Sequence, residues 1–134
     1  TGVQTCALPI CISNMLKKEL WAEVGYCREV VAVNEAAAKT YAVGTVLGKV
    51  TASGKYKIAV ETAVDGSKVG AAIVLEDKAI AATTDTKLVV LTRGPASISV
   101  GGLVLDATYD LDAEKAVVYA ALEAKGIQVL NKAA

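Results

Sequence analysis

Short runs of Val, Ile and Leu, separated by turns that contain glycine, constrain this chain more than any other feature of its sequence. The clearest runs are Arg28–Val33, Gly44–Val50, Lys55–Ile58 and Lys87–Thr92. Each is short for a helix, and β-branched residues favour the pleated, half-buried surface of a strand. The sequence therefore predicts a mainly β fold.

Two glycine-containing pairs predict hairpins. Ser53-Gly54 follows Gly44–Val50 and precedes the next strand-like run, which is a typical hairpin arrangement. Gly101-Gly102 lies between Ile98–Val100 and Leu103–Leu105, so we expect these two runs to pair with each other.

A helix is predicted near the C-terminal end. Ala113–Lys125 consists mostly of strong helix formers, Asp112 is the expected N-cap, and Gly126 suits the left-handed position after the last turn. Gln128–Leu130 then reads as a last strand. The fold class is mainly β with one C-terminal α-helix (α+β). We expect the helix to pack through apolar residues at helical spacing, namely Val117, Ala120, Ala121 and Ala124.

Composition narrows the classes of partner. The chain has 134 residues, which suits one domain, and 54% of them are hydrophobic. No apolar run approaches the roughly 20 residues that span a bilayer. Lys and Arg balance Asp and Glu at 14 each, so no electrostatic attraction to nucleic acid or membrane is expected. Protein surfaces remain the expected partners.

The absence of His lowers the expectation of enzymatic chemistry. Without His, the chain has neither Ser-His-Asp nor Cys-His nucleophilic machinery, and it lacks the commonest metal ligand. Cys6, Cys11 and Cys27 are odd in number and have no C-x-x-C spacing, which argues against a disulfide framework or a zinc site. We expect no catalytic residues, no metal and no cofactor.

The first residues are expected to lie outside the fold. Thr1–Ile10 matches one reading frame of a common sequencing-adapter oligonucleotide. We therefore interpret residues 1–14 as non-native or disordered, and leave them out of the fold prediction.

Residues 15–27 are interpreted as an N-terminal arm. Leu16, Leu20, Trp21 and Val24 have loosely helical spacing, but the stretch is short and Gly25 ends it. Two alternatives stay open: an arm that becomes ordered on a partner, or a short helix packed on its own domain.

Several segments follow one another in a characteristic order. The order begins with Gly44-Thr-Val-Leu-Gly-Lys-Val50, Ser53-Gly54-Lys55-Tyr56 and the Asp65-Gly66-Ser67 turn. It continues with Ala71–Leu75, Leu88-Val-Val-Leu-Thr-Arg-Gly94, Val104-Leu105 and an Ala-rich helix ending at Gly126-Ile127. This ordered set resembles the lambda-type bacteriophage head decoration proteins over Arg28–Leu130. The chain departs from that family in lacking prolines after Tyr56 and a Trp before the last helix.

The resemblance implies a structural virion protein. Residues 28–134 would form a single decoration domain with a β-clip-like body, and residues 15–27 an extended capsid-binding arm. The protein would be made in the host cytoplasm and act as a homotrimer on the outer surface of the capsid. It would bind the major capsid protein at local threefold positions of the expanded shell and stabilise the head. The arm would add a strand to a capsid sheet. Its candidate binding residues are Leu16, Leu20, Trp21, Val24 and Tyr26, of which Trp21 and Tyr26 are the expected anchors.

Two other functions remain as alternatives. One is a ligand-binding module or enzyme on a small β scaffold, which would need a polar pocket with convergent titratable groups. The other is a carrier domain of lipoyl or biotinyl type, which presents a Lys at a hairpin tip. Lys49 and Lys55 lie near such a hairpin but lack the acidic or Met-flanked signature of a modified lysine.

Overall fold

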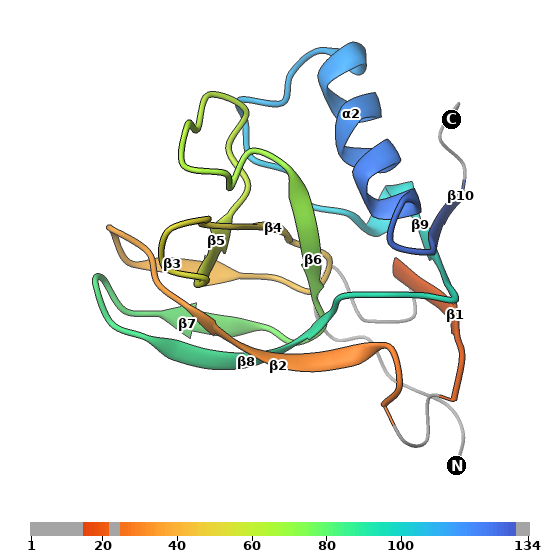
Figure 1. The fold of residues 1–134 in the computed structure, drawn as a ribbon, viewed down its shortest axis with the longest axis horizontal. Coiled ribbons are helices and arrows are strands. Elements are labelled where there is room, and N and C mark those ends of the chain that lie inside the picture. Colours follow the sequence, from red (N-terminus) through yellow and green to blue (C-terminus); the bar gives the residue numbers. More distant parts are fainter. Residues whose placement is uncertain (1–14, 22–24, 131–134) are drawn as a thin grey trace.

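The computed structural model describes residues 15–21 and 25–130, and most of its regular structure is β (Figure 1). A closed barrel forms its centre, with the strand order β2-β5-β4-β6-β8. Strands β2 and β8 pair antiparallel over their full lengths, from Arg28 opposite Leu91 to Val33 opposite Thr86. The barrel strands are β2 (Arg28–Val33), β4 (Val46–Lys49), β5 (Tyr56–Ile58), β6 (Gly70–Val74) and β8 (Thr86–Leu91).

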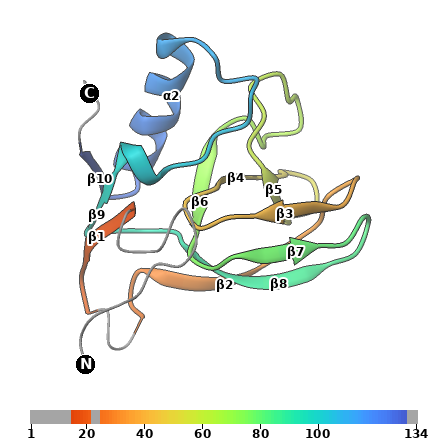
Figure 2. The same ribbon diagram turned by 180° about the vertical axis from the view of Figure 1, so that it is seen from behind.

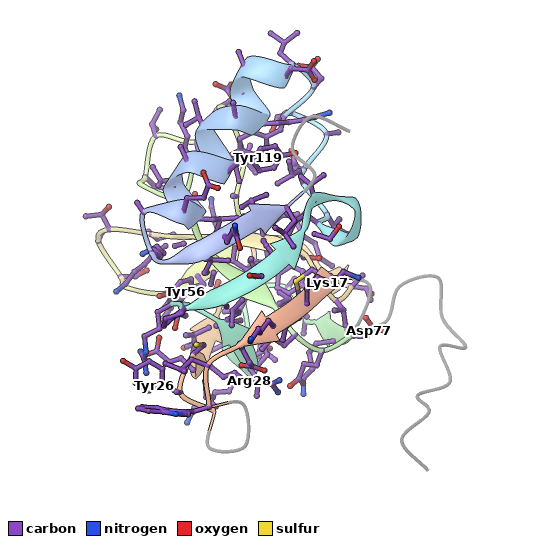
Figure 3. The ribbon with its side chains drawn as sticks, turned by 90° about the vertical axis from the view of Figure 1, so that its right-hand side faces the viewer. Lys17, Tyr26, Arg28, Tyr56, Asp77 and Tyr119 are labelled. Atoms are coloured by element: carbon purple, nitrogen blue, oxygen red, sulfur yellow. The ribbon has the colours of Figure 1, made fainter. Side chains whose placement is uncertain are left out.

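A second sheet lies beside the barrel and faces the viewer in Figure 3. It consists of β1 (Leu16–Glu19), β9 (Ala96–Ser99) and β10 (Ile127–Leu130), with β9 in the middle. Strand β1 is antiparallel to β9, whereas β10 is parallel to it. Helix α2 (Asp112–Glu123) packs against β10 and β6.

A two-stranded ribbon lies on a different side of the molecule from α2 (Figure 2). It pairs β3 (Lys39–Tyr41) with β7 (Lys78–Ile80) in antiparallel register. These two strands are short and come from connections between barrel strands.

The predicted mainly β fold with a C-terminal helix is confirmed. The prediction of Arg28–Val33 matches β2, and the runs Gly44–Val50 and Lys55–Ile58 contain β4 and β5. The latter two strands pair antiparallel across the predicted Ser53-Gly54 turn. Gln128–Leu130 lies within β10. These strands could be predicted because β-branched residues favour strands, and many of their side chains are buried in one of two apolar clusters.

The buried side chains form two clusters. The first contains Tyr41 and Ile80 of the ribbon and one alternating set of barrel residues: Val31, Val33, Leu47, Ala72, Val74, Leu88 and Val90. The second contains barrel residues of the opposite alternation together with Met15, the second sheet and α2, including Val46, Ile73, Leu91, Ile98, Leu122 and Ile127. The barrel therefore separates two apolar cores.

Gly48 of β4 lies against the turn that precedes β6. A Cβ at Gly48 would overlap the carbonyl oxygen of Ser67. The predicted Asp65-Gly66-Ser67 turn is confirmed, because the Asp65 Oδ1 accepts a hydrogen bond of 3.0 Å from the Ser67 backbone N–H. Only a residue without a side chain permits this approach between strand and turn.

The predicted packing face and N-cap of the helix are wrong. Val118 and Leu122 are the buried residues of α2, whereas Val117 is 57% exposed and Ala120 and Ala124 are also exposed. Leu111, rather than Asp112, occupies the N-cap. The Glu114 carboxylate accepts a 3.1 Å hydrogen bond from the Leu111 backbone N–H. A side chain of the first helical turn therefore provides a partner for a backbone N–H at the helix start.

The predicted hairpin across Gly101-Gly102 is also wrong. Val100–Gly102 forms a 3-10 turn, and the chain then continues toward β4 instead of returning along β9. Val104 forms a parallel bridge with Thr45, supported by a 3.0 Å hydrogen bond from the Val46 N–H to the Val104 carbonyl. The neighbours of β9 are β1 and β10, which are both distant from it in sequence.

Candidate functional site

The N-terminal arm lies on the body of the protein. Leu16 pairs with Ile98 and Glu19 with Ala96, so β1 extends the sheet at β9. The preceding residue, Met15, is fully buried in the second core. The alternative of a short helix is therefore wrong for Leu16–Glu19, which form a strand.

The five predicted binding residues divide into three groups. Leu16 is half-buried and packs against the second core, so it supports the arm. Leu20, Trp21 and Tyr26 are exposed by 36%, 56% and 40%, respectively. Val24 lies outside the described residues.

Trp21 and Tyr26 meet at the turn between β1 and β2. Their rings stack edge to face, with centroids 5.2 Å apart and an interplanar angle of 81°. The Tyr26 backbone N–H donates a 3.4 Å hydrogen bond to the Trp21 carbonyl. Figure 3 shows Tyr26 at one end of the molecule, away from α2.

Arg93 completes this surface and was missed in the sequence. Its Nε donates a 2.9 Å hydrogen bond to the Tyr26 carbonyl, and its guanidinium carbon lies 5.4 Å from the centre of the Tyr26 ring. The Arg93-Gly94-Pro95 segment reads only as a strand break, and no local signal places it beside residue 26. We call Leu20, Trp21, Tyr26 and Arg93 the aromatic tip.

An ion pair holds the arm to the barrel beneath this tip. The Nε of Arg28 lies 3.0 and 3.1 Å from the two carboxylate oxygens of Glu19, and its Nη2 contacts the same carboxylate. The Glu19 side chain is only 4% exposed. The hydrogen bond from Arg28 to Glu19 raises the pKa of the guanidinium above its usual value, so Arg28 stays charged.

Cys27 fixes the other side of the turn. Its buried thiol contacts the Pro95 carbonyl at 3.5 Å, and its own carbonyl accepts a 3.1 Å hydrogen bond from the Thr92 N–H. The Leu20 N–H donates to the same Pro95 carbonyl at 2.9 Å. The backbone on both sides of the turn that carries Trp21 and Tyr26 is therefore attached to the segment between β8 and β9.

A shallow groove of about 250 Å³ adjoins the aromatic tip at Leu20. Its floor includes a polar row across the second sheet, in which Lys18 and Gln128 both lie opposite Ser97. The Ser97 hydroxyl donates a 3.0 Å hydrogen bond to Gln128. The tip and the groove form one surface with exposed aromatic, cationic and polar groups, which is the composition of a protein-binding site.

The described residues contain neither a metal-binding cluster nor a membrane-spanning helix. In residues 15–21 and 25–130, no group of three or more His, Cys, Asp or Glu side chains is arranged to hold a metal ion. No helix in this part of the chain has the length and apolar content to cross a membrane.

Comparison with known proteins identifies one family. The family model described as bacteriophage lambda head decoration protein D matches residues 12–127, which includes the arm, the barrel and α2. A search of curated proteins found no match.

Proposed function

Because the chain belongs to the bacteriophage lambda head decoration protein family, we propose that it binds the outer surface of the expanded capsid as a homotrimer and stabilises the head. Family membership places the protein among structural components of the phage capsid. We further propose that binding occurs at the local threefold positions of the shell. The partner is then the major capsid protein, and the aromatic tip is the surface that contacts it.

The exposure of Trp21 and Tyr26 is the observation that carries this proposal. Trp, Tyr and Arg are the residues that most often dominate the binding energy of protein interfaces. Here all three types lie together, because the Tyr26 ring contacts both Trp21 and the Arg93 guanidinium. Trp21 is the only Trp in the chain and is exposed to water. A partner that covers the aromatic tip removes this apolar surface from water, which favours association.

The attachment of the arm supports a preorganised contact. The Glu19–Arg28 ion pair and the β1–β9 pairing hold the turn in place before binding. A preorganised surface loses less conformational entropy on association. On a homotrimer, three such tips act together, and multivalency of this kind raises avidity by about 100-fold to 10,000-fold over one contact.

The arm is also proposed to add a strand to a sheet of the capsid protein. Residues 15–27 are the proposed capsid-binding arm, and residues 28–134 the proposed decoration domain. Because Met15 and Cys27 are core residues, deleting the whole arm would disturb the body as well as the contact. Substitutions at the tip separate the two effects.

The experiment compares binding to purified expanded and unexpanded heads that lack decoration protein. We expect the wild-type protein to cosediment with expanded heads, and the double variant Trp21→Ala/Tyr26→Ala to bind at least about tenfold more weakly. Val30→Ala is the matched control, since Val30 is also exposed, by 60%, but lies outside the tip. Equal binding by the double variant and the control would refute the assignment of the tip.

A further inference from the structure

Helix α2 has apolar residues on the side that faces away from the body. Val118 and Leu122 point into the second core, and the opposite side of the helix is exposed. We call this exposed side, with the N-cap residue, the outer helix face. Its Leu111 and Val117 are 60% and 57% exposed, and its remaining residues are Ala113, Ala116 and Ala120.

A helix that is apolar on both sides is normally covered on both sides. Surface helices in soluble proteins carry charged or polar residues on the outer side, but the middle of this outer helix face has none. Exposed contiguous apolar surface of this kind marks an interaction site. Exposed acids lie at both ends of this region: Asp110 and Asp112 flank Leu111 at the N-terminal end, and Glu123 is the last residue of α2.

The β3–β7 ribbon carries a surface of the complementary kind. An open groove of about 470 Å³ runs over it, lined by Ala38, Lys39, Thr40, Ala79, Ile80 and Ala81. We call it the alanine groove. Three of its six lining residues are alanines, and Ile80 is buried, so a helix can approach the ribbon backbone closely at Ala38, Ala79 and Ala81.

The charges around the two surfaces are opposite. Lys39 lines the alanine groove and Lys78 lies on the same ribbon, whereas the outer helix face ends at Asp110 and Asp112. None of these four forms an ion pair within the described part of the chain. Asp77, the acid nearest to the groove in sequence, accepts a 2.9 Å hydrogen bond from the Val43 N–H.

We infer that the outer helix face of one copy docks into the alanine groove of a second copy. The inference rests on the self-association included in the proposed function, and it assigns the surfaces involved. The two surfaces lie on different sides of the molecule (Figures 1 and 2), so one copy can use both at once. Such a head-to-tail contact is heterologous, and a threefold rotation closes it into a ring.

The first test measures the mass of the full chain in solution by light scattering during size-exclusion chromatography. We expect Val117→Glu and Ala79→Glu each to weaken association by about 100-fold, because each places an uncompensated carboxylate in an apolar contact. Val30→Glu changes a similarly exposed valine on β2 and should remain a trimer. Circular dichroism melts check that each variant is folded.

Mixing the two disrupted variants tests the head-to-tail arrangement. Val117→Glu keeps an intact groove and Ala79→Glu keeps an intact helix face, so an equimolar mixture should form heterodimers that do not close. If the helix faces instead met each other, Ala79→Glu alone would remain trimeric and the inference would be overturned.

Charge reversal gives a third readout. Asp112→Lys and Lys39→Asp should each weaken association, and the double variant should recover at least part of it. A wild-type chain that is monomeric both in solution and on heads would refute the proposed trimer itself. A trimeric wild type with unaffected Val117→Glu and Ala79→Glu variants would refute only the interface assigned here.

Discussion

The hydroxyl of Tyr41 donates a hydrogen bond to the buried carboxylate of Glu35. The same carboxylate accepts a 2.7 Å hydrogen bond from the Ile58 backbone N–H, and Glu35 is only 4% exposed. Through these contacts one acid links the β3–β7 ribbon to β5 of the barrel. A buried carboxylate is tolerated here because protein donors replace its water.

Tyr41 makes the stability of the protein sensitive to alkaline pH. Burial, and then the hydrogen bond to Glu35, raise the pKa of Tyr41 above its usual value of 10.0. The phenol therefore stays protonated in the folded protein at pH values where it ionises in the unfolded chain. This contribution to stability is complete below about pH 10 and is lost as the pH rises further.

We expect urea denaturation to show this loss. Between about pH 10 and 11, the unfolding free energy of the wild type should fall more steeply than that of Tyr41→Phe, by up to about 1.4 kcal/mol per pH unit. The comparison removes the contribution of lysines, which both proteins share. Parallel pH profiles would contradict the environment assigned to Tyr41.

The Glu19–Arg28 ion pair should stabilise the attachment of the arm. Arg28→Ala leaves the buried Glu19 carboxylate without its cation, so we expect a loss of about 2 kcal/mol in unfolding free energy. Glu19→Ala/Arg28→Ala should lose less than the sum of the two single changes, since neither charge is left alone. Lys87→Ala, at an exposed position of β8, is the control. Strictly additive losses would show that the two residues are not coupled.

Gly48 should be intolerant of any side chain. Gly48→Ala forces β4 away from the Ser67 carbonyl, and we expect a loss of at least about 2 kcal/mol or a failure to fold. A Cβ at Gly101 would meet only the Ser99 hydroxyl at 3.9 Å, so Gly101→Ala should change stability by less than about 0.5 kcal/mol. Thermal melts of the two variants measure the difference, and similar melting temperatures would contradict the close approach at Gly48.

Trp21 provides a direct optical signal for capsid binding. It is the only Trp in the chain and is 56% exposed, so its emission reports on the aromatic tip alone. We expect a shift to shorter wavelength and weaker acrylamide quenching when the protein binds heads, because the indole loses water contact. Heads contribute fluorescence of their own, so a Trp21→Phe sample gives the background. Bound protein with unchanged Trp21 emission would show that the tip stays in solvent.

Local sequence signals predicted most of the barrel strands. Alternating and continuous Val, Ile and Leu residues identify strands such as β2 and β8, since their preference for strands acts over a few residues. Such local signals could not predict which strands pair with β9. Strand β1 approaches it from the N-terminal arm and β10 from beyond α2, so both pairings depend on the tertiary fold.

The prediction of the packing face of α2 was wrong for a different reason. Alanine has helix propensity but little preference for a buried or an exposed position, so the spacing of Ala120 and Ala124 did not identify the inner side. Val118 and Leu122 are larger and fill the core. In the aromatic tip, the exposed Trp21 and Tyr26 were identified from residue type, whereas the partnership with Arg93 needed the three-dimensional fold.

The barrel wall between the two apolar cores divides the molecule into regions that can open separately. The core beneath the arm contains Met15 and is contacted by Leu16 of the four-residue strand β1. The other core is enclosed by longer pairings such as that of β2 with β8. Backbone amides of the region beneath the arm should exchange with deuterium sooner than those of β2 and β8. The chain can thus loosen at the end that carries the aromatic rings while the far side of the barrel keeps its shape.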